Sequence, residues 1–279
     1  MSLSDHLASC EALVRKVDYD RYLAALFAPA QARPHLLALY AFNYEIAKTG
    51  ESVSEPVLGQ IRLQWWREAI EDVYAGRARA HEVVQPLAAA VAAHDLPRGL
   101  FEALIEAREK DLEDAPFAQE AELISYAEAT SGHLMRLAAR ILGAGDRLDA
   151  AARDAGIAYA LTGALRALPF HAARGRLMLP AEALGGVRLS QEQVFSGAMD
   201  EKVTALIARM AARAREHLKF AQRTPIPRAV LPALLPAALV RIYLNVMTRA
   251  QFNPFRDSTE VPVHRRQLAM LGAMVRRRL

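Results

Sequence analysis

The sequence predicts an all-α protein, and three observations support this fold class. The composition is 53% hydrophobic and keeps Gly and Pro at 14 residues each, and Ala and Leu dominate it, a balance that favours helices. Apolar residues recur at helical spacing through most of the chain. No segment alternates with period two between hairpin turns, as strands would. We therefore expect one helical domain over residues 1–279, without an internal boundary.

The individual helices follow from apolar spacing and from end signals. Pro34 predicts the start of the first helix, because the backbone N–H that proline lacks has no partner within the first turn of a helix. Gly76 is a plausible C-terminal cap of the second helix. Residues 1–20 are expected to be a loose N-terminal segment. The predicted helices cover residues 35–48, 57–75, 83–94, 98–113, 120–142, 148–168, 200–221, 228–249 and 263–278.

Charge, cysteine content and hydropathy exclude several classes of protein. A net charge of +4, from 35 basic and 31 acidic residues, gives no indication of nucleic-acid binding. The single cysteine, Cys10, excludes an internal disulfide and a cysteine-based metal cluster, and it fits a reducing compartment. The longest apolar run, Ala229–Val240, is shorter than the roughly 20 residues of a membrane-spanning helix. We expect no secretory signal and a cytoplasmic protein.

Residues 156–180 read GIAYALTGALRALPFHAARGRLMLP. This run resembles the second substrate motif of the squalene/phytoene synthase family, the head-to-head prenyl transferases. The matching positions are Gly156, Ala158, Leu161, Thr162, Leu165, Arg166, Arg174, Gly175, Arg176, Leu179 and Pro180.

Further matches follow in the family's order over roughly residues 18–250. They are Ala38–Phe42, Leu63–Glu68, Ile70–Asp72, and Tyr126 with Gly132 and Leu134. Each match alone is weak, but their order and spacing together are specific. The resemblance implies the isoprenoid (terpenoid) synthase-type helical bundle around a central cavity. The segments 40–47 and 156–168 would then face each other across that cavity.

The family's metal-binding carboxylates are mostly missing. Magnesium prefers hard oxygen ligands, and paired aspartates at i and i+4 supply them in the family. Here the first motif reads Ala47-Lys48-Thr49-Gly50-Glu51, so only Glu51 remains, and Ala167 and His171 replace both aspartates of the second. Pro169 should also kink or end the helix between them. We expect no metal and no cofactor, with magnesium only if the chain is nevertheless an enzyme.

Basic residues of the same motifs remain and could hold an anionic head group without metal. The candidate ligand-binding residues are Tyr40, Lys48, Arg166, Arg174 and Arg176. The alternative is that these cations are solvated or paired with acids, and the two interpretations are equally favoured. The acidic run at residues 106–114 is interpreted as a charged helix face, with pairs such as Glu106 and Lys110, although the resemblance leaves it a weaker role in the site.

One branch of the family, the complex I assembly factor with a phytoene-synthase-like domain, resembles this chain more than the catalytic branches do. The shared runs are Ala41–Ala47, Ser52–Glu55, Arg108–Asp114 and Leu165–His171. The resemblance implies a non-catalytic protein that assists assembly of respiratory NADH dehydrogenase, with complex I subunits or other assembly factors as partners. A lipid or isoprenoid ligand could occupy the old cavity. The alternative is an active squalene- or phytoene-type synthase with a degenerate metal site.

Residues 263–279 form a basic C-terminal helix with apolar residues at helical spacing. The stretch 264–279 holds five arginines and no acid. Such a helix can lie on an anionic membrane surface, which would place the protein peripherally on the inner face of the membrane. The slightly favoured alternative is a final helix that packs on the bundle and leaves a solvated basic end.

Overall fold

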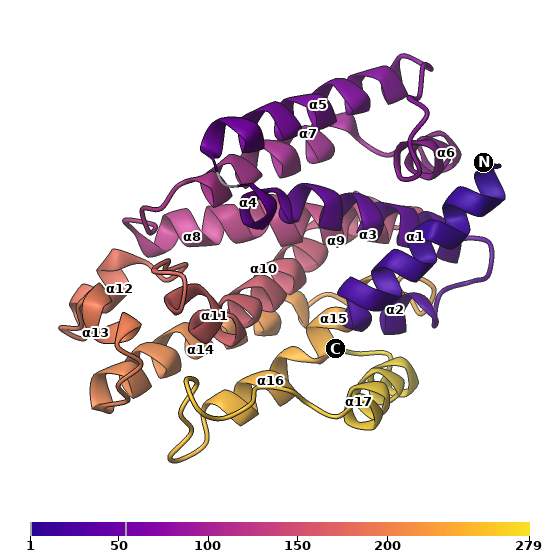
Figure 1. Cartoon of the computed structure of the whole chain (residues 1–279). Helices are drawn as coiled ribbons and strands as arrows, with labels where there is room; N and C mark the ends of the chain where they lie inside the picture. Colours follow the sequence, from indigo (N-terminus) through magenta and orange to yellow (C-terminus); the bar gives the residue numbers. More distant parts are fainter. Residues whose placement is uncertain (1, 54) are drawn as a thin grey trace.

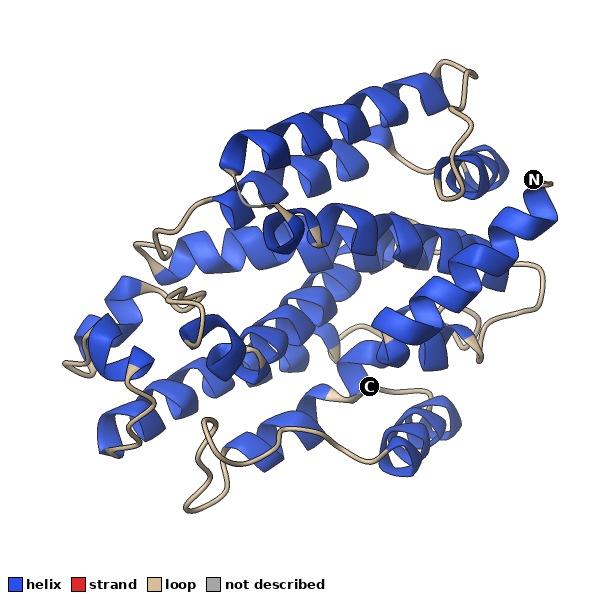
Figure 2. Ribbon diagram, in the orientation of Figure 1, coloured by secondary structure: helices blue, strands red, loops and turns tan. Residues whose placement is uncertain are grey.

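The computed structural model describes residues 2–53 and 55–279. Within this part of the chain every regular element is a helix and none is a strand (Figure 2). The all-α prediction is therefore confirmed. Met1 and Ser54 lie outside the described residues, so the Ser52–Glu55 match is only partly covered.

The N-terminal half contains three of the predicted helices almost unchanged. Its elements are α1 Leu3–Val17, α2 Tyr19–Ala25, α3 Arg33–Ala47, α4 Thr49–Ser52, α5 Pro56–Tyr74, α6 Val84–His94, α7 Arg98–Ala107 and the 3₁₀-helix η1 Arg108–Leu112. Pro34 lies in the first turn of α3, as expected. Gly76 follows the end of α5 with φ of 73°, a left-handed conformation that glycine adopts without strain. The helix predicted at 98–113 is divided, because its last turn tightens into η1.

The C-terminal half is more interrupted than its periodicity suggests. Its elements are α8 Glu120–Ala127, the π-helix η2 Glu128–Gly132, α9 His133–Ile141, the 3₁₀-helix η3 Asp146–Leu148, α10 Asp149–Arg166, α11 Leu168–Ala172, α12 Ala181–Gly186, α13 Gln191–Phe195, α14 Glu201–Ala221, α15 Leu231–Ala238, α16 Val240–Met247 and α17 Val263–Arg276. Pro169 lies in the first turn of α11, just after α10 ends, as its ring predicts. Helices α12 and α13 were not predicted.

The expectation of a loose segment at residues 1–20 is wrong, because this segment forms α1 and the start of α2. A capping box begins α1: Ser2 Oγ accepts a hydrogen bond from the Asp5 amide at 3.2 Å, and Asp5 accepts one from the Ser2 amide at 2.7 Å. Cys10 and Val14 are its buried residues. This apolar stripe is too narrow to stand out among charged neighbours. Burial raises the pKa of the Cys10 thiol to about 12.

The core surrounds α10, which lies along α14 and also contacts η2, α9, α15 and α16 (Figure 1). On another side, the Phe42 ring meets Trp66 edge-on at 5.4 Å and Phe101 at 5.5 Å between centroids. The apolar run Ala229–Val240 supplies the buried helix α15, as predicted. In the described part of the chain no helix combines the length and the apolar character needed to cross a bilayer.

A buried carboxylate joins four of these helices. Asp20 of α2 is only 5% exposed. It accepts hydrogen bonds from Arg266 of α17 at 2.6 Å and from Tyr243 of α16 at 2.7 Å. Tyr159 of α10 donates at 3.3 Å, and Arg166 of the same helix lies 3.8 Å away. Hydrogen bonds and counter-charge of this kind are what a buried carboxylate requires.

We expect Asp20→Asn to lower the free energy of unfolding by about 3 kcal/mol, because losing one member of a buried ion pair leaves the other charge uncompensated. Urea denaturation followed by circular dichroism measures the change. The matched control is Asp114→Asn, whose side chain is 98% exposed and whose partner Arg176 lies 3.9 Å away, so its midpoint should not move. Equal midpoints for both variants would contradict this role of Asp20.

Candidate functional site

A pocket of about 230 Å³ lies between α10 and the helices opposite it. We call it the central pocket. One wall is α10 with α11, and Asn43 of α3 lies across from it. The other polar lining comes from η1, α8, η2 and α2. Segments 40–47 and 156–168 therefore both contribute to one pocket.

The row of α10 and α11 that would carry metal ligands faces this pocket with small side chains. Ala160, Gly163, Ala167 and His171 all line it. Burial lowers the pKa of His171, which favours the neutral imidazole. Nowhere among the described residues do three or more His, Cys, Asp or Glu side chains come together as a metal site. The donor set here does not fit magnesium, which needs several oxygen ligands.

The opposite wall carries a half-buried cation that is held by two partners. Arg108 Nη1 donates to Tyr126 Oη at 2.9 Å and to Asp111 Oδ2 at 3.1 Å. Tyr126 in turn donates to Asp111 Oδ1 at 2.6 Å. Burial opposes the charge, but Tyr126 and Asp111 outweigh it and the pKa of Arg108 is raised. Arg108 therefore faces the pocket as a fixed guanidinium whose charge Asp111 largely balances.

A second cation enters the pocket from α2. Arg21 donates to Asp18 at 2.5 Å, and its guanidinium lies over the rings of Tyr159 at 5.0 Å and Tyr40 at 5.8 Å. Burial alone would lower its pKa, but Asp18 and the tyrosines raise it. Tyr40, a candidate ligand-binding residue, is 2% exposed, and its ring stacks against the Arg21 guanidinium. Stacking and the ion pair fix Arg21 in one orientation.

Three polar atoms around the pocket lack partners. They are Asn43 Oδ1, Arg108 Nε and Ser131 Oγ, each buried and without a hydrogen bond from any described residue. Buried polar groups are nearly always satisfied in folded proteins. They are a donor, an acceptor and a hydroxyl, but all three are covered by protein, so a group inside the pocket does not reach them in this conformation.

The π-helix η2 owes its position to a close crossing. A Cβ on Gly156 of α10 would lie 2.5 Å from both Gly132 Cα and the Ser131 carbonyl oxygen. Only glycine permits this approach, which brings Thr130 and Ser131 to the pocket wall. Thr130 Oγ1 donates to the Tyr126 carbonyl at 2.7 Å and so ties η2 to α8. Single π-turns of this kind are frequent at functional sites.

The cations predicted for a head group lie elsewhere. Arg166 stacks on the Tyr243 ring at 3.8 Å and faces Asp20. Arg174 is exposed and stacks on Phe170 at 3.6 Å. Lys48 pairs with Glu45. None of the three lines the central pocket as the structure describes it.

Other candidates have structural contacts. Arg176 Nη2 donates to the carbonyl oxygens of Asp111 and Glu113, both at 2.6 Å, so it braces η1, which carries Arg108. Glu51 is exposed at the end of the former first motif, and Ala47 is half-buried. Neither Glu51 nor Ala47 appears in the described lining of the pocket.

Arg21 and Arg108, the two cations that line the pocket, were not among the ligand-binding residues predicted from the sequence. Arg21 falls next to the segment expected to be loose. Arg108 falls in the run interpreted as a charged helix face, but its side chain is only 14% exposed and lines the pocket. The sequence suggested an ion pair between Glu106 and Lys110. In the structure Lys110 pairs instead with Glu113, at 2.6 Å. The signal that could have identified Arg108 was the resemblance of 108–114 to the assembly-factor branch.

The fold is of the isoprenoid-synthase type, and the described lining of its central pocket contains no carboxylate. The family model for squalene/phytoene synthase matches residues 14–267. The chain belongs to this family.

The similar proteins include one named as an assembly factor and others named as synthases. NADH dehydrogenase (ubiquinone) complex I assembly factor 6 of Mus musculus is 35% identical over 254 residues, which cover 90% of this chain and 76% of that protein. The 15-cis-phytoene synthase of Synechococcus elongatus is 25% identical over 294 residues, covering 99% and 94%. A crystal structure of a dehydrosqualene synthase superposes with a TM-score of 0.87 at 19% identity, covering 98% and 96%, which supports the fold alone.

Two glycines of α10 give a matched test of the η2 crossing. Gly156→Ala should destabilise the protein by roughly 1–3 kcal/mol, because its methyl group meets backbone that cannot move freely. For Gly163→Ala no atom lies within 4 Å of the added Cβ, so better helix propensity should stabilise the protein by up to about 1 kcal/mol. Urea denaturation separates the two variants. Opposite signs are expected, and equal effects would contradict the crossing.

Proposed function

We propose that this protein is a non-catalytic member of its family that assists the assembly of respiratory NADH dehydrogenase. Two observations support the proposal. The relative of 35% identity is named as a complex I assembly factor. The row Ala160, Gly163, Ala167 and His171 supplies no carboxylate where magnesium would be held. The second observation carries the non-catalytic part of the proposal, because the charge of a departing diphosphate has to be neutralised and no metal-binding carboxylates are placed to do so. The first observation carries the assembly role.

We also propose that the central pocket binds the polar head of a lipid-like or prenyl ligand without metal. Arg108 and Arg21 supply guanidinium groups, and Asn43, Thr130 and Ser131 add polar side chains to the lining. A volume of about 230 Å³ is below the roughly 300–1,000 Å³ of pockets that enclose whole drug-sized ligands. The pocket therefore suits a head group, with the apolar tail leaving through its open side.

We propose that the protein works peripherally on the inner face of the membrane, with complex I subunits or other assembly factors as partners. The basic helix α17 supports this location, since its arginines would be attracted to anionic lipids.

Deleting the gene in its source organism should reduce assembled NADH dehydrogenase, measured on native gels and as NADH oxidation by membranes.

Purified protein given farnesyl or geranylgeranyl diphosphate with magnesium should release no pyrophosphate above blank. Turnover that a chelator abolishes would contradict the non-catalytic assignment and favour the synthase alternative.

Arg108→Lys should weaken binding of farnesyl diphosphate, titrated in the presence of EDTA, about tenfold. Lysine keeps the charge but loses the planar fork, and a hydrogen bond to a charged group contributes about 1.5–3 kcal/mol. The control is Arg174→Lys, an exposed site outside the described pocket lining, which should bind as the parent does. Equal losses in both variants would place the head group elsewhere.

A further inference from the structure

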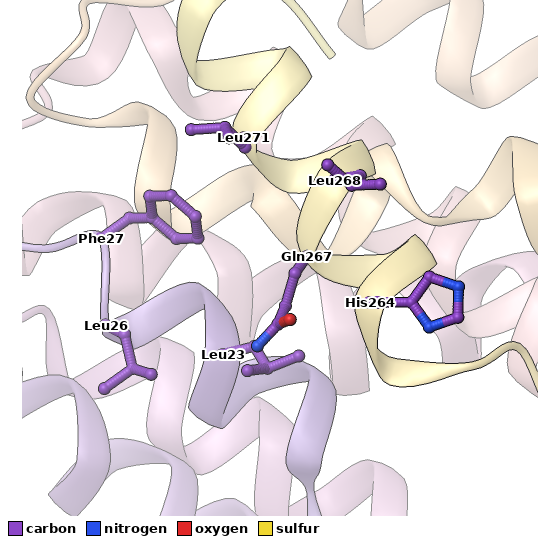
Figure 3. A pocket seen from close by; sticks show the side chains of 7 residues that line it. All are labelled: Leu23, Leu26, Phe27, His264, Gln267, Leu268 and Leu271. Atoms are coloured by element: carbon purple, nitrogen blue, oxygen red, sulfur yellow. The ribbon is translucent and has the colours of Figure 1, made fainter.

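An apolar groove of about 520 Å³ lies between α2 and α17. Leu23, Leu26 and Phe27 form one wall, and Leu268 and Leu271 stand on the other (Figure 3). We call it the α2–α17 groove. It joins residues about 240 positions apart in the sequence, and it lies outside the central pocket.

Helix α17 is apolar on two sides. Its inner side buries Met270 and Ala273 against the bundle. Its outer side presents Leu268, Leu271 and Val275, which are 64%, 49% and 74% exposed. Their spacing of three and four residues places them on one face of the helix. A helix that only packed on the bundle would need a single apolar stripe, so the outer stripe requires another explanation.

Helix α17 itself carries only positive charges. No Asp or Glu occurs from Val261 to Leu279. Arg265 and residues 276–278, all arginine, are exposed. The remaining arginine, Arg266, turns inward to Asp20 at 2.6 Å. In the preceding loop, Asp257 pairs with Arg256 at 2.9 Å and Glu260 is exposed. Exposed arginines therefore lie on both sides of the apolar stripe along the chain.

The contact with Asp20 keeps this surface in place. Asp20 is buried, and the Arg266 side chain is 17% exposed, so the ion pair fixes α17 beside α2. The α2–α17 groove is thus formed in the folded protein and does not depend on a helix that orders only on binding. A preformed surface loses less conformational entropy when it docks.

We propose that the α2–α17 groove and the outer stripe of α17 form a docking surface for an anionic lipid bilayer. Leu268, Leu271 and Val275 enter the acyl-chain boundary while the flanking arginines contact lipid phosphates. The groove receives an acyl chain between Phe27 and Leu271. The combination of an exposed apolar stripe with cations on both sides favours lipid over a protein partner. This inference rests on the peripheral location given in the proposed function.

Co-sedimentation of the full-length protein with vesicles tests the proposal. Vesicles of phosphatidylglycerol and phosphatidylcholine should bind it at 0.1 M salt, and pure phosphatidylcholine should bind at least tenfold less. Binding should fade toward 1 M salt, because the Debye length shortens from roughly 10 Å to 3 Å. The double variant Leu268→Glu with Leu271→Glu should lower the partition coefficient at least tenfold, with an unchanged circular dichroism spectrum.

The matched control substitutes two equally exposed apolar residues on α5, at the opposite side of the molecule in Figure 1. Val57 and Ile61 are 59% and 62% exposed, and Val57→Glu with Ile61→Glu should bind vesicles within twofold of the parent. No binding of the parent protein to anionic vesicles, or equal loss in both double variants, would overturn the proposal.

The vesicle test needs no respiratory enzyme, so it separates this inference from the proposed function. Normal vesicle binding together with unchanged NADH dehydrogenase after gene deletion would remove the assembly role and keep the docking surface. If gene deletion lowers assembled NADH dehydrogenase but the protein does not bind vesicles, the assembly role is kept and the lipid docking surface is rejected. That outcome would favour a protein partner on the same surface.

Discussion

The buried carboxylate of Asp20 is the constraint on which the arrangement of both binding surfaces depends. Its desolvation is offset only because Arg266 and two tyrosine hydroxyls converge on it from different helices. That convergence fixes α2. The next residue, Arg21, then reaches the central pocket, while Leu23 one turn further faces α17. A single buried carboxylate therefore sets the geometry of an interior cation and of an external apolar groove.

Two acids beside the central pocket hold the cations that line it. Asp111 and Asp18 each bind an arginine directly. They balance Arg108 and Arg21 and fix their orientation, and they are not available to share a divalent cation. The pocket therefore has fixed donors and little net charge, which suits recognition of a polar group and not the departure of a diphosphate.

Much of the fold could be predicted from the sequence because the long helices carry wide apolar stripes and clear ends, such as Pro34 and Gly76. The missed helix α1 buries only Cys10 and Val14 in the described structure, too few to produce a periodic signal. The row facing the pocket could be predicted from spacing in α10. The pocket cations could not, since the burial of Arg21 and Arg108 depends on tertiary partners far away in sequence, such as Tyr159 and Tyr126.

The chemistry of Cys10 has a practical consequence. Its side chain is 1% exposed and its Sγ lies 3.6 Å from the Glu82 carbonyl oxygen, and thiolate, not thiol, is the reactive form. With its pKa raised to about 12, the native thiol stays inert toward maleimide probes at neutral pH. A cysteine introduced anywhere on the surface would be the sole labelling site, so fluorescent or spin labels can report on one chosen helix without first removing the native thiol.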